Sequence, residues 1–166
     1  CNDIYKKLYN DGFKNTLIIA PPGGGKTTAL RELIRLLSDS GLRCAVADER
    51  NELAASDMGQ AQFDLGTHSD VLTGVNKAQA AIMLLRGMNP QIVAMDEITR
   101  REDAEAIREL YGCGVGLLAS AHAVSPEDMR CRSLYRELLD GEIFARLLII
   151  SSRAGRRSYE VRCLCT

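Results

Sequence analysis

Residues 15–28 have the sequence NTLIIAPPGGGKTT, in which a short apolar run ends at a turn rich in proline and glycine. The apolar run predicts a buried strand over 15–20, and the apolar residues that recur at helical spacing from Lys26 onward predict a helix ending near Gly41. A glycine-rich loop that joins a strand to a helix and ends in Lys-Thr is typical of a phosphate-binding loop. One position departs from the usual pattern, because Ala20 stands where the first glycine is expected.

The chemistry of this phosphate loop (residues 20–27) predicts a bound nucleotide. The glycines let backbone N–H groups surround phosphate oxygens without obstruction from a Cβ. Lys26 would place a positive charge beside the outer phosphates, and the hydroxyl of Thr27 is the expected Mg²⁺ ligand. The alternative is a glycine-rich turn followed by Lys-Thr by chance, which the preceding strand and following amphipathic helix argue against. The residues expected to bind the nucleotide are Pro22, Gly23, Gly24, Gly25, Lys26, Thr27 and Thr28.

The rest of the chain alternates between extended and helical patterns. Further strands are predicted over 44–47, 91–95 and 115–119. Further helices are predicted over 75–87, 102–110 and 125–139, whereas the glycine-containing stretch 56–74 is predicted to be irregular. Two extended runs over 142–152 and 157–164, separated by 154–156, predict a C-terminal β-hairpin. The alternation predicts an α/β fold with a mainly parallel sheet flanked by helices.

The length of 166 residues fits a single domain. We therefore expect one domain over 1–166, in which 142–166 form the terminal hairpin. Because the first residue is Cys rather than Met, we expect 1–14 to be a lead-in from a missing N-terminal part.

Asp96 and Glu97 follow the apolar run 92–95 and form the second candidate half of the site. Asp96 is expected to hold Mg²⁺, usually through water, as in other enzymes with a phosphate loop. Glu97 is placed to orient or deprotonate an attacking water, which favours hydrolysis over transfer to a substrate. The alternative for both residues is a solvated acidic end of a strand.

Two more polar groups are predicted at the same edge of the sheet, since ligands in such folds bind at the carboxyl ends of strands. His122 follows the strand predicted over 115–119 and would contact the γ-phosphate or the attacking water; the alternative is a structural histidine. The charged cluster 48–52 follows the strand predicted over 44–47, and its alternative role is to cap a helix. His68, in the glycine-containing region, is expected at the surface.

The composition excludes several functional classes. The net charge is −1, with 46% hydrophobic and 26% charged residues, so a globular domain without direct nucleic-acid binding is expected. No apolar run reaches the length of a membrane span, and no signal peptide is visible. The six cysteines include no CxxC pair, which favours reduced thiols and no zinc. Arginine outnumbers lysine by 16 to 5, which suits phosphate or subunit contacts.

Several arginines are candidates for the cation that stabilises charge developing on the γ-phosphate. They are Arg100, Arg101, Arg153, Arg156 and Arg157. One of them would reach the nucleotide of a neighbouring subunit, whereas the alternative for those around the hairpin turn is a solvated turn.

The order of phosphate loop, acidic cluster, acidic strand end and histidine resembles the ATPases of bacterial secretion and type IV pilus machines. Residues 84–90 and 96–104 are similar to the acidic-strand region of those ATPases. Residues 46–52 and 70–72, together with Lys77, resemble the stage III sporulation protein AA family more specifically, over nearly the whole chain. Asp96 departs from many secretion ATPases, which have glycine there.

The resemblance implies a RecA-like ATPase core of the ASCE class that uses ATP and Mg²⁺. It also implies that Glu49 and Glu52 occupy acidic-box positions, with Glu49 close to the nucleotide, and that Arg100 is a charged position after the strand. A ring-forming homo-oligomer, expected to be hexameric, is implied. Its implied partners are membrane proteins of a sporulation channel complex, and its implied place is the cytoplasm of the mother cell, peripheral to the membrane.

Three other functions compete with ATP hydrolysis, and one other setting competes with sporulation. Residues 76–79 superficially resemble a guanine-reading motif, but Gln79 replaces its Asp, which argues against a GTPase. A small-molecule kinase lacks a recognisable arginine-rich lid. A nucleotide-gated scaffold with little hydrolysis would keep every binding residue and stays open, as does an ATPase of a secretion or pilus machine unconnected with sporulation.

Overall fold

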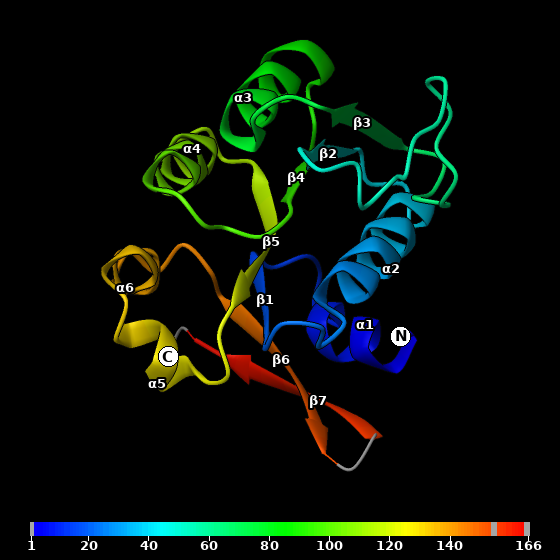
Figure 1. Ribbon diagram of the computed structural model, residues 1–166. Coiled ribbons are helices and arrows are strands. Elements are labelled where there is room, and N and C mark those ends of the chain that lie inside the picture. The colour runs from blue at the N-terminus through cyan, green and yellow to red at the C-terminus, as the bar shows by residue number, and fades with distance from the viewer. Residues whose placement is uncertain (1, 154–155, 165–166) are drawn as a thin grey trace.

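The computed structural model describes residues 2–153 and 156–164, and within them the strands form one seven-stranded sheet (Figure 1). The strands are β1 (Thr16–Ala20), β2 (Cys44–Asp48), β3 (Ser69–Thr73), β4 (Ile92–Met95), β5 (Gly116–His122), β6 (Arg146–Arg153) and β7 (Arg156–Cys163). The helices are α1 (Asn2–Tyr9), α2 (Lys26–Asp39), α3 (Lys77–Met88), α4 (Arg101–Gly112), α5 (Pro126–Arg130) and α6 (Ser133–Asp140).

The strand order is β3-β2-β4-β5-β1-β6-β7, and every neighbouring pair is parallel except β6 and β7, which pair antiparallel. The predicted mainly parallel sheet with a C-terminal hairpin is therefore confirmed, although the predicted turn residues 154–155 lie outside the described residues. β5 lies between β1 and β4, so the end of β5 is flanked by the phosphate loop and by the acidic residues after β4. This strand order positions the candidate site.

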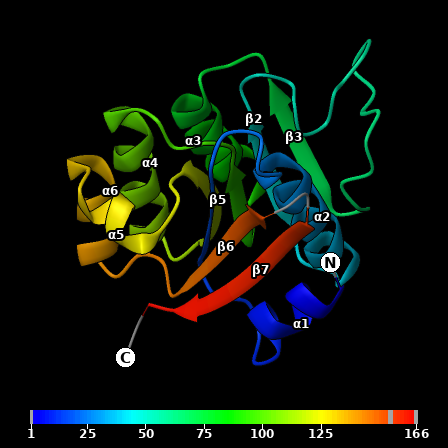
Figure 2. The ribbon, with the colours of Figure 1, turned by 60° about the horizontal axis from the view of Figure 1, so that its bottom comes forward.

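Helices cover both faces of the sheet, as Figure 2 shows. Alternate strand residues such as Leu17 and Val93 pack with α3, α4, α5 and α6 on one face. The intervening residues, such as Ile18 and Ala94, pack with α1 and α2 on the other face. Strands buried on both faces are nearly continuous apolar runs, which is why β1, β2 and β4 were recognisable in the sequence. Among the described helices, none combines the length and apolarity that crossing a membrane requires.

The segment predicted as a lead-in forms α1, which is packed against the domain. Leu8 at its C-terminal end is fully buried, and the Tyr9 hydroxyl donates a hydrogen bond to Thr16 Oγ1 at 3.1 Å. Leu8 and Tyr9 are thus part of the core on the α2 side.

Four local predictions were wrong. The irregular region 56–74 contains β3, an edge strand whose five residues are mostly half-buried and lack a strong apolar pattern. The single helix predicted over 125–139 is divided into α5 and α6, because Arg132 has an extended backbone between them. The strand predicted to end at 119 continues to His122, since the small residues Ser120 and Ala121 pair with β1. In the hairpin, β6 begins only at Arg146.

Candidate nucleotide-binding site

The phosphate loop makes a tight turn between β1 and α2. Gly24 N–H donates to the carbonyl of Pro21 at 3.0 Å, and Gly25 has a φ of +94° just before α2. A Cβ at Gly24 would lie 2.7 Å from the Ala20 Cβ, so this position requires glycine. The Ala20 methyl group, the one departure from the usual loop pattern, is therefore accommodated because residue 24 has no side chain.

A cavity of about 340 Å³ opens beside this loop and is called the phosphate-loop cavity below. Its lining residues are Gly23, Gly25, Lys26, Thr27, Thr28, Glu52, Glu97, His122 and Arg157. The structure thus brings together most of the predicted site residues from the loop, from the end of β4 and from the end of β5. Pro22 and Gly24 belong to the loop but do not line the cavity, and neither do Asp96 and Glu49.

His122 connects the phosphate loop to the acidic end of β4. Lys26 Nζ lies 2.7 Å from His122 Nδ1, and His122 Nε2 lies 2.9 Å from Glu97 Oε1. A charged lysine can only donate, so Nδ1 accepts from Lys26 while Nε2 carries the proton that is donated to Glu97. This connection, called the His122 bridge below, follows from the strand order, because His122 pairs with Ala20 in the register of β1 and β5.

The Lys26 side chain sits in a perturbed environment, with only 6% of the residue exposed. Its burial lowers the pKa of the ammonium group, because the charged form loses water; the nearby carboxylates of Glu97 and Asp96 oppose that shift. The loop therefore holds a buried cation close to two anions, at the place where a phosphate group is expected.

Asp96 is held by its neighbours just outside the cavity. Its Oδ1 accepts hydrogen bonds from Glu97 N–H at 2.9 Å and from the Ser120 hydroxyl at 3.1 Å. Within the described residues, Oδ2 makes no hydrogen bond, which fits a half-buried carboxylate able to receive a metal or its water. Ser120 was not predicted to act in the site, although it lies two residues before His122 on β5.

Lys77 is a second buried cation, and its sequence position did not predict a role in the site. Only 4% of the residue is exposed, and its ammonium group donates to the backbone carbonyl of Glu97. The same group lies 3.7 Å from Asp103 Oδ2 and 3.9 Å from Glu49 Oε2. Lys77 therefore ties α3 to the loop that carries Glu97 and to the N-terminus of α4. In the sequence, Lys77 stands near the start of a predicted helix. A lysine at such a position is ordinarily exposed, so the sequence did not indicate its burial.

Glu49 faces Lys77 rather than the phosphate-loop cavity. Besides Lys77, it contacts Arg100 NH1 at 3.5 Å through Oε1. The acidic-box residue that lines the cavity is Glu52. Glu49 is thus connected to Glu97 through the Lys77 ammonium group.

The charged cluster after β2 is organised by Asp48, which is fully buried. Its carboxylate accepts hydrogen bonds from the backbone N–H groups of Glu52, Leu53 and Ala54, at 2.9 to 3.1 Å. Asp48 therefore fixes a turn rather than capping a helix, and this turn presents Glu52 to the cavity.

Arg157 brings the hairpin to the phosphate loop of its own chain. A Cβ built on Gly25 would lie 3.1 Å from the Arg157 Cζ, and Arg157 lines the cavity. By contrast, Arg101 pairs with Glu105 at 3.6 Å and Arg100 with Glu49. Of the arginines that the sequence offered as candidates, Arg157 is thus placed to act within one chain.

Comparison with known families and proteins agrees with the resemblance drawn from the sequence. Residues 2–162 match the family described as "Sporulation stage III, protein AA". Stage III sporulation protein AA of Bacillus subtilis (strain 168) is 38% identical over 153 residues, which cover 89% of this chain and 50% of that protein. The uncharacterized protein ycf45 of Porphyra purpurea is 30% identical over 140 residues, 83% of this chain and 25% of that protein. The chain thus spans half or less of these relatives.

Solved structures agree in fold, at low sequence identity. The VirB11 ATPase of the Brucella suis type IV secretion system, in complex with sulphate, has a TM-score of 0.68 at 17% identity, covering 98% of this chain and 51% of that one. The pilus retraction motor PilT with bound ADP has a TM-score of 0.64 at 14% identity, covering 100% and 51%. A KaiC-like protein of Pyrococcus horikoshii OT3 has a TM-score of 0.63 at 16% identity, covering 95% and 84%. The predicted RecA-like fold is confirmed.

Proposed function

Because this chain belongs to the sporulation stage III, protein AA family, we propose that it binds ATP with Mg²⁺ and hydrolyses it to drive a secretion-like channel complex. The observation that carries the proposal is the His122 bridge at the phosphate-loop cavity. It joins the cation expected to hold the outer phosphates to the carboxylate expected to activate water. Solved neighbours that are described as ATPases support this proposal at the level of the fold.

The lining residues fit a nucleotide polyphosphate. Backbone N–H groups of residues 23–28 lie at the positive end of α2, where they suit phosphate oxygens. Gly25 has no Cβ, so no side chain at this position obstructs the approach of a phosphate. Lys26 and Arg157 supply positive charge to the lining of the cavity. Mg²⁺, when bound, would be held by Thr27 and Asp96 and would neutralise charge that develops on the phosphates.

The proton of the attacking water goes to Glu97 in this proposal. The Lys77 ammonium group holds the Glu97 backbone carbonyl, and His122 Nε2 holds its Oε1, so the carboxylate has a fixed position. A phosphate oxygen would compete with His122 Nδ1 for the three protons of the Lys26 ammonium group. His122 would thereby report the occupancy of the phosphate site to Glu97.

The proposed biological setting is a ring-forming homo-oligomer on the cytoplasmic side of a membrane, attached through membrane proteins of the same sporulation complex. Arg157 is proposed to stabilise the developing charge within its own chain, since it lies against Gly25. A ring would therefore be needed for coupling to the channel rather than to complete the set of cations around the phosphates.

A second candidate function is a nucleotide-gated scaffold that hydrolyses little ATP. The observation that favours it is that Lys26 and Glu97 are both engaged by His122. If that bridge persisted with nucleotide bound, His122 would continue to engage both Lys26 and the carboxylate expected to activate water. Turnover, rather than binding, separates the two functions.

Binding of Mg²⁺-ATP by calorimetry tests the site itself. Lys26→Ala should weaken the affinity about 10- to 100-fold, because a hydrogen bond to a charged group is worth about 1.5–3 kcal/mol. Lys14→Ala, which removes an exposed lysine before β1, is the matched control and should bind like the parent. Unchanged affinity in a folded Lys26→Ala protein would contradict the assignment of the phosphate loop.

A further inference from the structure

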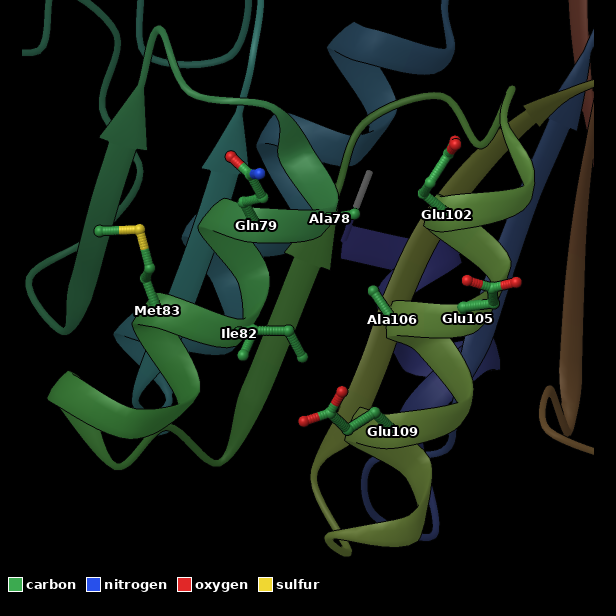
Figure 3. A pocket seen from close by; sticks show the side chains of 8 residues that line it. All are labelled: Ala78, Gln79, Ile82, Met83, Glu102, Glu105, Ala106 and Glu109. Carbon is green, nitrogen blue, oxygen red and sulfur yellow. The ribbon is translucent and has the colours of Figure 1, made fainter.

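A groove of about 510 Å³ runs between α3 and α4, and Figure 3 shows the side chains that line it. Its α3 side is apolar or neutral, and its α4 side carries three glutamates beside one alanine. The lining residues are Ala78, Gln79, Ile82, Met83, Glu102, Glu105, Ala106 and Glu109. None of them lines the phosphate-loop cavity, so the groove is a separate feature.

The acidic wall consists of Glu102, Glu105 and Glu109, which are spaced along one face of α4. No lysine or arginine is among the lining residues. Glu105 lies 3.6 Å from Arg101 and Glu109 lies 3.9 Å from Arg86, but these pairs are exposed and contribute little. The three carboxylates therefore remain available to cations on a partner.

The apolar wall extends beyond the groove. Met83 is 56% exposed and Met88 is 49% exposed on α3. Met83 also lines a smaller cavity of about 240 Å³ toward the edge strand β3, together with Asp70, Val71, Leu72, Leu84 and Met88. Exposed apolar side chains such as these two methionines are typical of an interaction site, and methionine adapts its shape to a partner.

We propose that the groove between α3 and α4 binds a basic amphipathic helix of a partner protein. The lining residues reach from Glu102 to Glu109 along α4, about 10 Å at the helical rise per residue, so the groove matches about two turns of a partner helix. The apolar stripe of that helix would pack on Ile82, Met83 and Ala106. Its lysine or arginine residues would lie along the carboxylates of α4. This inference does not depend on ATP binding, because the two cavities share no residue.

The probe is a dye-labelled peptide of about 14 residues, designed as an amphipathic helix with a leucine stripe flanked by lysines. Fluorescence anisotropy measures its binding to the 166-residue chain. We expect saturable binding that weakens with added salt. A peptide of the same design with glutamate in place of lysine should bind at least about tenfold more weakly. No saturable binding, or equal binding of the two peptides, would overturn the proposal.

Variants locate the binding to the groove. Met83→Ser should weaken binding about tenfold, whereas Met58→Ser, at a methionine that is 98% exposed elsewhere, should leave it unchanged. Glu105→Gln with Glu109→Gln should weaken binding about fivefold and reduce the salt dependence. The control of equal charge change, Asp57→Asn with Glu142→Gln, should bind like the parent, since both side chains are exposed away from the groove.

Parental binding by the Met83 and glutamate variants would place the peptide elsewhere and overturn the proposal. Sedimentation identifies the other occupant that the surface could take. If the parent chain self-associates, and Met83→Ser abolishes this association while Met58→Ser does not, then a second copy fills the groove and the partner-helix proposal is wrong.

Discussion

Replacing the buried Lys77 with methionine removes the cation that links three parts of the site while keeping most of the side-chain volume. Lys77 contacts Asp103 at 3.7 Å, Glu49 at 3.9 Å and the Glu97 carbonyl. Asp103 is fully buried, and its Oδ1 has no hydrogen-bond partner among the described residues. Without Lys77, a carboxylate would stay buried with no compensating charge.

The expected loss is set by this burial. Removing one partner of a buried ion pair costs about 3–5 kcal/mol, and in a domain of this size that lowers the Tm by roughly 10 °C. The matched exposed pair is Arg101 with Glu105 at 3.6 Å, where Arg101 is 79% exposed. Arg101→Met should therefore cost less than about 1 kcal/mol.

Urea denaturation followed by circular dichroism measures these free energies of unfolding in a double-mutant cycle. Asp103→Asn keeps an oxygen that can accept from the backbone N–H groups of Thr99 and Arg100, as Asp103 Oδ2 does at 2.9 Å. The double variant Lys77→Met/Asp103→Asn should recover about 1–3 kcal/mol relative to the sum of the single variants. A cost of Lys77→Met no larger than that of Arg101→Met, with additive effects in the cycle, would refute the reasoning.

Three further predictions concern the phosphate loop and its bridge. Gly24→Ala should weaken Mg²⁺-ATP affinity at least about tenfold in calorimetry, because its Cβ would lie 2.7 Å from the Ala20 Cβ. The control is Gly87→Ala in α3, whose Cβ would meet nothing within 4 Å; this variant should bind Mg²⁺-ATP like the parent. Burial lowers the pKa of the Lys26 ammonium group, so its charge is lost at a lower pH than that of an ordinary lysine. As the pH rises, ATP affinity should therefore begin to fall in the parent before an ordinary lysine would titrate, and it should show no such fall in Lys26→Ala. Equal pH profiles would contradict this. His122→Ala should retain ATP and lose about 100-fold in turnover by phosphate-release assay, and a parental rate would show that the bridge is not needed.

The parts of the fold that the sequence predicted are those with strong local patterns. β1, β2 and β4 are apolar runs because both faces of the sheet are covered. The glycine-rich turn before Lys26, with a strand before it and a helix after it, is specific to phosphate-binding loops. β3 was missed because an edge strand with half-exposed residues takes its pairing from β2 rather than from its own composition.

The edge of the sheet at which the site residues gather was predicted, but their contacts were not. His122 lies between Lys26 and Glu97 because β5 is inserted between β1 and β4, and this strand order is set by tertiary packing. Similarly, the buried environment of Lys77 arises from loops distant in the sequence. The backbone turn around Asp48 decides that Glu52, rather than Glu49, lines the cavity.

The central claim, that this chain hydrolyses ATP with Glu97 as the group that activates water, is tested by phosphate release from Mg²⁺-ATP at saturating nucleotide. The parent and Glu97→Gln should bind ATP with similar affinity, since glutamine keeps the shape of the side chain. The parent should release phosphate only with Mg²⁺ present, and Glu97→Gln should do so at least about 100-fold more slowly, because an amide does not accept the proton. Equal rates in the two proteins would contradict the role of Glu97, and no release from the parent, even with its membrane partners present, would contradict hydrolysis and favour the scaffold.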